Sequence, residues 1–105
     1  MKSCSASHRV AGFLGSVLLL ACPVGCARNA TAIECRALLD RYVELLVREQ
    51  DPKADEGEIA KQKALTRSKA EHDSDFASCP KKVSSREVRC AMVAPNVDEF
   101  EKCLE

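Results

Sequence analysis

Cysteine offers the most varied chemistry in this chain, which contains seven of them. Four lie beyond residue 27, at Cys35, Cys79, Cys90 and Cys103. Zinc-binding cysteines normally come in close pairs, and no two of these four lie within one helical turn of each other. His72 is the one histidine of this region. The pattern therefore predicts disulfide chemistry, and we expect no metal and no cofactor.

The first 27 residues predict where that chemistry takes place. Lys2, His8 and Arg9 form a short basic start, and a run without charged residues follows from residue 10 to residue 21. Small residues then precede a cut after Ala27, which is the layout of a secretory signal peptide. We therefore expect residues 1–27 to be a signal peptide and residues 28–105 to be the mature domain. The expected location is secreted or periplasmic, where disulfides persist.

The alternative is a bacterial lipoprotein. Residues 19–22, Leu-Leu-Ala-Cys, resemble a lipobox in which Cys22 would be acylated and become the new N-terminus. Cysteine parity favours the ordinary signal peptide, because a cut before Cys22 leaves Cys26 as an odd thiol. A cut after Ala27 leaves four cysteines that can all pair. An uncleaved anchor is disfavoured because the apolar run is shorter than the roughly 20 residues that span a bilayer.

A second group of chemically capable side chains occupies residues 71–75, which read Glu-His-Asp-Ser-Asp. A hydrolytic site could use these groups, but adjacent residues on a helix point in different directions and do not converge. We expect a solvated helix end with His72 half-buried. The sequence shows no nucleophile–base pair, no glycine-rich phosphate loop and no metal-binding loop. It therefore predicts a protein that is not an enzyme.

Net charge and aromatic content indicate which class of partner molecule the chain can bind. The chain carries 16 Lys and Arg against 16 Asp and Glu, so its formal net charge is zero, and it lacks tryptophan. A basic stretch between residues 61 and 69 is expected to be a solvated face. The chain has neither the basic field nor the aromatic platforms of a nucleic-acid binder, so we predict no nucleic-acid partner. The expected partner is an unidentified protein or envelope component, with membrane contact only if Cys22 is lipidated.

Helices must position these residues, and the strongest predicted helix runs from residue 32 to about Gln50. Thr31 and Glu34 have the form of an N-terminal capping box. Asp40 and Glu44 are expected to pair with arginines of the same helix. Apolar side chains recur at steps of three and four residues, which predicts one buried stripe. Its members are Cys35, Leu38, Leu39, Tyr42, Leu45 and Leu46.

Weaker helices are expected after it. The segment from residue 58 to residue 76 is rich in helix formers but poor in apolar residues, which predicts a helix with its outer face in water. A flexible insert is the alternative. Ser84 and Glu87 form a second capping box, and Asn96 caps a last helix. The side chains expected to face inward are Ile59, Leu65, Phe76, Val88, Ala91, Met92, Val97, Phe100, Cys103 and Leu104.

These elements predict an all-α fold, a small disulfide-stapled bundle of about four helices. A long hairpin would be followed by a short C-terminal hairpin. An antiparallel long hairpin brings Cys35 close to Cys79, and the turn near Pro95 brings Cys90 to the height of Cys103. The first pairing is therefore Cys35–Cys79 with Cys90–Cys103, and the alternative is Cys35–Cys90 with Cys79–Cys103.

Residues 34–104 resemble the small exported four-cysteine helical proteins of some bacteria. The resemblance rests on a cysteine near the start of a long helix, a Cys-Pro before a basic turn, the segment Ser-Ser-Arg-Glu-Val-Arg-Cys-Ala and a final Glu-Lys-Cys-Leu. It implies a fold and an exported location but no activity. Saposin-like domains are a more distant comparison, because they carry six cysteines where the mature chain keeps four.

The partner-facing surface is predicted on the outer flank of the first helix. A binding module needs exposed apolar or arginine anchors, since a few residues carry most of the binding energy. With the apolar stripe assigned to the core, Val43 and Val47 remain, flanked by Arg36 and Arg48. The alternative is that both valines pack beneath the second or fourth helix.

Overall fold

The computed structural model describes residues 27–105, and the regular secondary structure in this part of the chain is helical. This confirms the predicted all-α fold. Residues 1–26 of the predicted signal peptide (residues 1–27), including the lipidation candidate Cys22, lie outside the described residues. The helices are α1 (Ala32–Gln50), α2 (Glu56–Ala70), α3 (Ser74–Ala77), α4 (Cys79–Lys82), α5 (Ser85–Met92) and α6 (Val97–Lys102).

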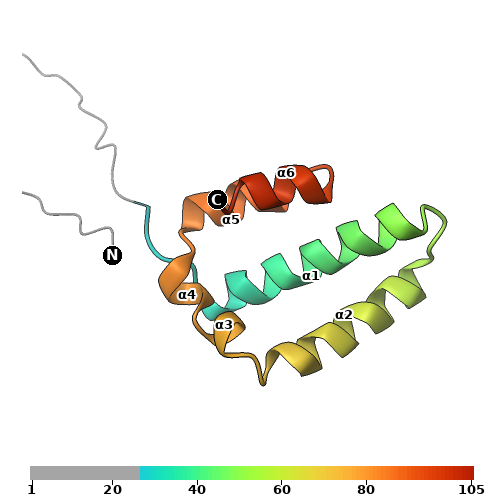
Figure 1. Cartoon of the computed structure of the whole chain (residues 1–105), viewed down its shortest axis with the longest axis horizontal. Helices are drawn as coiled ribbons and strands as arrows, with labels where there is room; N and C mark the ends of the chain where they lie inside the picture. Colours follow the sequence, from blue (N-terminus) through green and yellow to red (C-terminus); the bar gives the residue numbers. More distant parts are fainter. Residues whose placement is uncertain (1–26) are drawn as a thin grey trace, which may run out of the picture.

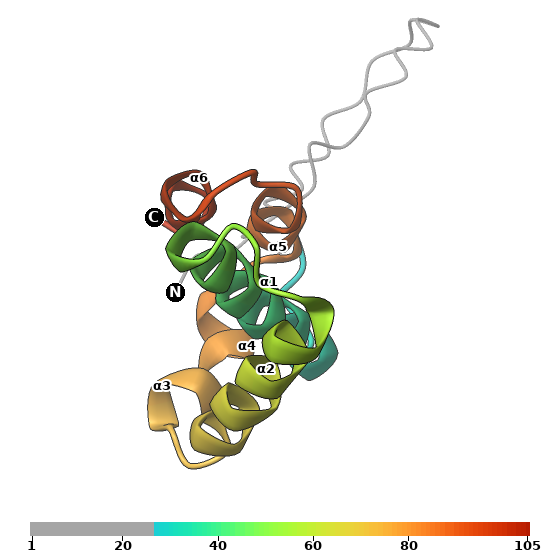
Figure 2. The same cartoon turned by 90° about the vertical axis from the view of Figure 1, so that its right-hand side faces the viewer.

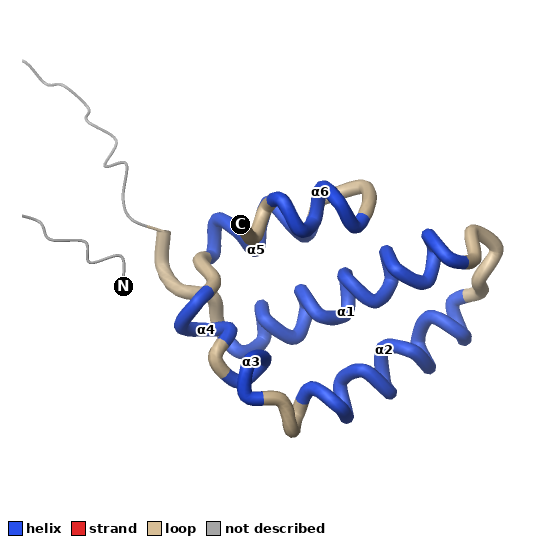
Figure 3. Tube along the Cα trace, in the orientation of Figure 1, coloured by secondary structure: helices blue, strands red, loops and turns tan. Residues whose placement is uncertain are grey.

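The helix α1 is the centre of the fold. It lies between α2 on one side and α5 with α6 on the other, and α4 contacts it near its N-terminal end (Figures 1 and 2). Short loops join successive helices (Figure 3). The predicted long hairpin, α1 with α2, and the predicted short C-terminal hairpin, α5 with α6, are therefore both confirmed.

The start and end of α1 follow the sequence signals. The Thr31 hydroxyl accepts a hydrogen bond from the Glu34 backbone N–H at 3.1 Å, and the Glu34 carboxylate accepts one from the Thr31 N–H at 2.8 Å. Arg28 holds the same carboxylate through two contacts of 2.7 and 2.8 Å. The predicted caps at Ser84 and Asn96 also form. Cap chemistry in this chain is therefore decided locally.

The second long helix differs from the predicted one at both ends. It begins at Glu56, because the Asp55 carboxylate accepts a hydrogen bond from the Glu58 N–H at 2.8 Å. It ends at Ala70 rather than Phe76. The Asp73 carboxylate caps a new helix, α3, by accepting from the N–H of residue 75 at 2.7 Å. An aspartate at this position competes with helical hydrogen bonding, so the chain breaks at residues 71–73 and turns.

A further difference lies at Lys81 and Lys82, which form the basic turn expected after Cys79 and Pro80. They belong to the one-turn helix α4, which has a proline in its first turn and is capped by Val83. Proline is tolerated there because the first N–H groups of a helix have no intrahelical partner. Both lysines are exposed, as a solvated segment requires.

The core lies where α1, α5 and α6 meet. Two side chains expected to face inward do not: Leu65 is 49% exposed and Met92 is 37% exposed. On α2 the buried positions are Ile59 and Ala70, so Leu65 lies on another side of the helix. Met92 is the last residue of α5 and lies beside the buried Ala91, on the exposed side of the helix end. The buried cluster consists of Ala30, Cys35, Leu38, Leu45, Val88, Ala91, Ala94, Val97 and Phe100.

Two disulfides staple this core. Cys35 of α1 is bonded to Cys79 of α4 with a Cα–Cα distance of 6.2 Å, and Cys90 of α5 is bonded to Cys103 after α6 with 5.6 Å. The first predicted pairing is therefore confirmed. Two disulfides are typical of a non-reducing, extracellular-type environment. In the described part of the chain, no helix is both long and apolar enough to cross a membrane.

Candidate binding groove

Three faces of α1 contact different surroundings. One face carries the buried residues that pack in the core, such as Leu38 and Leu45. A second face carries charged residues at a spacing of four, Asp40, Glu44 and Arg48, which share one side of a helix. A third face carries Leu39, Tyr42 and Leu46, which are half-buried. The candidate site is built on this third face.

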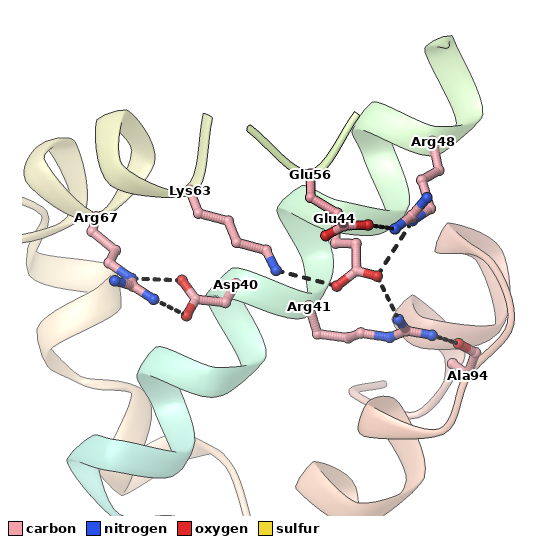
Figure 4. A network of polar contacts seen from close by, with 8 residues as sticks. All are labelled: Asp40, Arg41, Glu44, Arg48, Glu56, Lys63, Arg67 and Ala94. Atoms are coloured by element: carbon pink, nitrogen blue, oxygen red, sulfur yellow. Dashed lines mark hydrogen bonds and ion pairs between the residues drawn. The ribbon is translucent and has the colours of Figure 1, made fainter. Parts of the chain in front are cut away.

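The charged face of α1 holds α2 in place (Figure 4). Arg67 of α2 donates to both carboxylate oxygens of Asp40, with Nε at 2.7 Å from Oδ1. Lys63 Nζ lies 3.2 Å from Glu44 Oε2. The prediction that Asp40 pairs within α1 is wrong, and so is the prediction that Lys63 and Arg67 belong to a purely solvated face. Exposed ion pairs contribute only about 0.2–1 kcal/mol each, but together they fix the position of α2.

Glu44 is the hub of this network. Its Oε1 also contacts Arg41 at 3.4 Å and Arg48 at 3.3 Å, and Arg48 reaches Glu56 at 2.7 Å. Burial raises the pKa of Glu44, but the neighbouring cations, led by the hydrogen bond from Lys63, have the larger effect, so the pKa lies below its ordinary value. The side chain therefore stays charged and keeps its partners near neutral pH.

Arg41 connects this face to the C-terminal hairpin. Its guanidinium Nη2 donates to the carbonyl oxygen of Ala94, in the turn between α5 and α6, at 2.9 Å. The two contacts on Arg41, with Glu44 on one side and Ala94 on the other, place the short hairpin relative to α1 (Figure 4). The ion pairs to α2 and the Arg41 contact to the α5–α6 turn thus hold the helices beside the third face of α1 in place.

The third face of α1 is the floor of an open groove with two adjoining lobes, and Leu39 and Tyr42 line both. We call the whole the α1 groove. The α6 lobe has a volume of about 360 Å³ and is lined by Cys35, Leu38, Leu39, Tyr42, Asp75, Phe76, Cys79, Val83, Phe100, Glu101 and Leu104. The α2 lobe has a volume of about 400 Å³ and is lined by Leu39, Tyr42, Val43, Leu46, Val47, Gln50, Asp51, Glu58, Gln62 and Thr66.

The α6 lobe of the groove stays open because the helices that border it are short. The helices α3 and α4 have four residues each and α6 has six, whereas α1 has 19. Seen along α1, α3 and α6 lie on the same side of it (Figure 2). They cover the apolar floor only in part. Full burial of a leucine side chain is worth about 1.5–3 kcal/mol, so the uncovered area of Leu39 and Leu46 is available to stabilise a bound partner.

Tyr42 stands where the two lobes meet. Its hydroxyl donates a hydrogen bond to Glu101 Oε1 at 2.9 Å, which links α1 to α6. Its ring lies 5.3 Å from the ring of Phe100, tilted by 41°. The hydrogen bond to the Glu101 carboxylate, together with burial, raises the pKa of Tyr42 above its usual value. Tyr42 is therefore a neutral, fixed part of the floor.

The charged residues that line the groove are all carboxylates. Asp75 and Glu101 belong to the α6 lobe, and Asp51 and Glu58 belong to the α2 lobe. Among the described lining residues there is no lysine or arginine. Lys82 approaches Asp75 at 3.4 Å, but both side chains are largely exposed, so this pair neutralises little of the field. The α1 groove is therefore apolar on its floor and negative at its borders.

The predicted partner-facing valines lie differently from the prediction. Val43 is buried, with 6% of its surface exposed, and Val47 is half-buried. Both line the α2 lobe, opposite Gln62 and Thr66 of α2. The prediction of an exposed patch is thus wrong for Val43, because α2 covers this flank of α1. The alternative, in which the valines pack beneath the second helix, describes Val43 correctly.

The other predicted sites are accounted for as well. Residues 71–75 are all exposed, including His72, which was expected to be half-buried. The carboxylate of Asp73 is used as a helix cap. These side chains occupy the break between α2 and α3, where no packed helix extends over them. In residues 27–105 no group of three or more His, Cys, Asp and Glu side chains is placed to hold a metal ion.

Sequence reasoning missed the groove because it assigned the whole apolar stripe of α1 to the core. The structure divides that stripe into a buried part and the half-buried part formed by Leu39, Tyr42 and Leu46. One signal was available. An apolar arc this wide needs long neighbouring helices to cover it, and the C-terminal helices have few apolar residues. Comparison with protein-family models, curated proteins and solved structures finds no match to this chain.

Proposed function

We propose that this chain is an exported, non-enzymatic binding module that receives a partner of the bacterial envelope or extracellular space in the α1 groove. One observation carries the proposal. The most apolar helix of the fold leaves Leu39, Tyr42 and Leu46 partly exposed, in a groove bordered by helices that are anchored to it. Apolar grooves with a few polar groups at their borders are the usual form of a binding site.

The chemistry of the lining residues supports binding rather than catalysis. The lining cysteines, Cys35 and Cys79, form a disulfide and offer no thiol. Tyr42 has a raised pKa and is held by Glu101, so it is a poor acid or base near neutral pH. The groove thus offers apolar surface, shape and negative charge. Two disulfides also support an exported location, because they keep a small domain folded outside the reducing cytoplasm.

The second candidate function is that of a membrane-anchored lipoprotein, and it rests on the lipobox-like residues 19–22. Intact mass spectrometry of the protein purified from its own envelope separates the two. A mass that begins at Arg28 supports the soluble exported module. A lipid-adducted N-terminal Cys22 would replace it with the anchored form, and a mass that begins at Met1 would contradict both.

The groove itself is tested by Leu39→Gln. Leu39 lines both lobes and lies outside the buried core cluster, so the change removes apolar floor, and circular dichroism checks that the variant folds. Val93→Gln is the matched control, because Val93 is 81% exposed at the end of α5 and away from the groove. Each variant is cross-linked in intact envelopes and its partners are counted by mass spectrometry. If cross-linked partners are lost with Leu39→Gln but kept with Val93→Gln, the proposal is supported. If both variants recover the same partners, it is contradicted.

A further inference from the structure

We propose that the occupant of the α1 groove is an amphipathic helix with a cationic flank, supplied by a partner protein. This inference rests on the proposed binding function and adds the chemistry of the ligand. The apolar floor matches the apolar side of such a helix. The carboxylates at the borders, Glu58 in the α2 lobe and Glu101 in the α6 lobe, match its lysines or arginines.

The walls of the groove favour a helix over an extended peptide. Most of the lining residues belong to helices whose backbone groups bond to one another, so the walls offer an incoming chain few backbone partners. An extended peptide would leave its own N–H and C=O groups unpaired against an apolar floor, which is costly. A helix brings its hydrogen bonds with it. From Cys35 to Gln50 the floor is about 22 Å long, enough for about four turns of helix.

The charges of the groove identify the sign of the partner. Asp51 and Asp75 extend the negative border beyond Glu58 and Glu101, and cations of α1 and α2, such as Lys63 and Arg67, are engaged in the ion-pair network on another face. A second copy of this chain would bring one negative groove against another, which is unfavourable. An anionic or acidic ligand would meet the same repulsion. A cationic helix is attracted to the groove carboxylates instead.

The probe is a synthetic 15-residue peptide of leucine and lysine, with leucine at helical spacing. The first comparison peptide has glutamate in place of every lysine, and the second is a scramble of the leucine–lysine sequence. Binding of each labelled peptide to the purified, oxidised protein is followed by fluorescence anisotropy in low and high salt. We expect the leucine–lysine peptide to bind about tenfold more tightly than either comparison peptide, and salt to weaken it.

Two matched double variants test the groove carboxylates. Glu58→Gln with Glu101→Gln removes two border charges, and the new amide at position 101 can still accept the Tyr42 hydrogen bond. Glu71→Gln with Glu105→Gln removes two exposed charges outside the groove. Both variants have the same net charge, and circular dichroism checks their folding. The Glu58→Gln/Glu101→Gln variant should bind the leucine–lysine peptide about fivefold more weakly than the unchanged protein. The Glu71→Gln/Glu105→Gln variant should bind it with nearly unchanged affinity.

The outcomes separate this inference from the proposed function. If Leu39→Gln abolishes native partner capture but the leucine–glutamate peptide binds as well as the leucine–lysine peptide, the groove is a binding site and the cationic helix is wrong. Equal effects of the two double variants, or no binding of the leucine–lysine peptide, also overturn the inference. Sedimentation that shows a dimer lost in Leu39→Gln would assign the groove to a second copy instead.

Discussion

Tyr42 combines three contacts in one side chain. It contributes to the floor of both lobes of the α1 groove, its ring packs beside Phe100, and its hydroxyl reaches Glu101. The ring and the hydroxyl do different things. The ring contributes apolar area to the core and the groove, and the hydroxyl connects α1 with α6. A substitution that removes the hydroxyl but keeps the ring therefore shows how much the Tyr42–Glu101 hydrogen bond contributes to holding α6 against α1.

Tyr42→Phe keeps the ring and removes the hydroxyl. We expect a loss of about 1 kcal/mol in the free energy of unfolding, because a single partly exposed hydrogen bond contributes about that much. Tyr42→Ala removes the ring as well and should cost more, about 2–4 kcal/mol for a half-buried aromatic side chain. Urea unfolding followed by circular dichroism measures both. Equal losses in the two variants would show that the ring contributes nothing beyond the hydrogen bond.

Glu34 gives the chain a defined response to acid. The hydrogen bond from Arg28, with help from the Thr31 backbone, lowers the pKa of Glu34 from 4.5 to about 2. The folded state therefore holds this proton less tightly than the unfolded chain does. Its contribution to stability is complete above about pH 4.5 and is lost as the pH falls towards 2. Glu34→Gln should show a smaller loss of stability across this window than the unchanged protein.

The measurement is the free energy of unfolding at several pH values between 5 and 2, with urea as the denaturant. Arg28→Gln is the companion variant, because it removes the main cause of the shift. In that variant, an NMR titration should place the pKa of Glu34 nearer to its usual value. An unchanged pKa would show that the capping contacts alone hold the carboxylate in its charged form.

At the scale of elements, α1 and α2 are held by different forces. Four residues of α1 are buried, and the helix packs against α2, α4, α5 and α6. In α2 the buried residues are Ile59 and Ala70, and ion pairs of Glu44 with Lys63 and of Asp40 with Arg67 add to its attachment to α1. Apolar packing is insensitive to salt at moderate concentration, whereas exposed ion pairs are screened. The two helices should therefore differ in their response to salt.

Amide hydrogen exchange tests this difference. Amides of residues 38–46 in α1 should exchange slowly, and those of the 51–55 loop should exchange quickly, because protection follows packing. Raising the salt to about 1 M, where the Debye length falls to about 3 Å, should speed exchange in α2 more than in α1. Equal protection of residues 38–46 and 51–55, or equal salt effects on the two helices, would contradict this division of forces.

For the whole molecule, the disulfides compensate for small size. A domain of this length buries too little surface to be strongly stable through its core alone. The Cys35–Cys79 bond joins residues 44 positions apart and ties the end of the long hairpin to α1. The Cys90–Cys103 bond joins residues 13 positions apart and closes the short hairpin. Each bond restricts the unfolded chain, and the longer loop is restricted more.

Replacing Cys35 and Cys79 together by serine should therefore cost about 4 kcal/mol, and replacing Cys90 and Cys103 together should cost about 3 kcal/mol. Denaturant unfolding of the two double variants and of the unchanged protein gives both values. The result that tests this explanation is which of the two double variants loses more stability. A larger loss for the shorter loop would mean that core packing around the sulfur atoms, rather than chain entropy, determines what each bond contributes.

Local chemistry decided which features could be predicted from sequence. The capping boxes at Thr31 and Ser84 depend on a few neighbouring residues, and both formed as predicted. The disulfide pairing followed from hairpin geometry. The break at Asp73 is just as local, and it was missed because the helix predicted from the good helix formers up to Glu71 was extended through residues 72–75, which are weak helix formers.

The groove was harder to predict because it depends on tertiary coverage. Whether Leu39 and Leu46 are buried is decided by the length and position of other helices, and the sequence of α1 alone does not contain that information. The same holds for Arg67, whose partner Asp40 lies 27 positions away. Val43 illustrates the opposite error: it was expected to be exposed, but α2, a separate helix, covers this flank of α1.

The order of the disulfides along the chain has a consequence for oxidative folding. The two bonds follow one another without overlap, because Cys79 precedes Cys90. If the chain is exported and cut after Ala27, as we propose, it leaves the translocation channel N-terminus first and presents Cys35 and Cys79 to an oxidant before Cys90 appears. Pairing in order of emergence then gives the native bonds directly. In an interleaved pattern the same order of emergence would favour a wrong first bond, which needs thiol–disulfide exchange to correct it. We therefore expect the exported form that we propose to fold oxidatively without a disulfide isomerase.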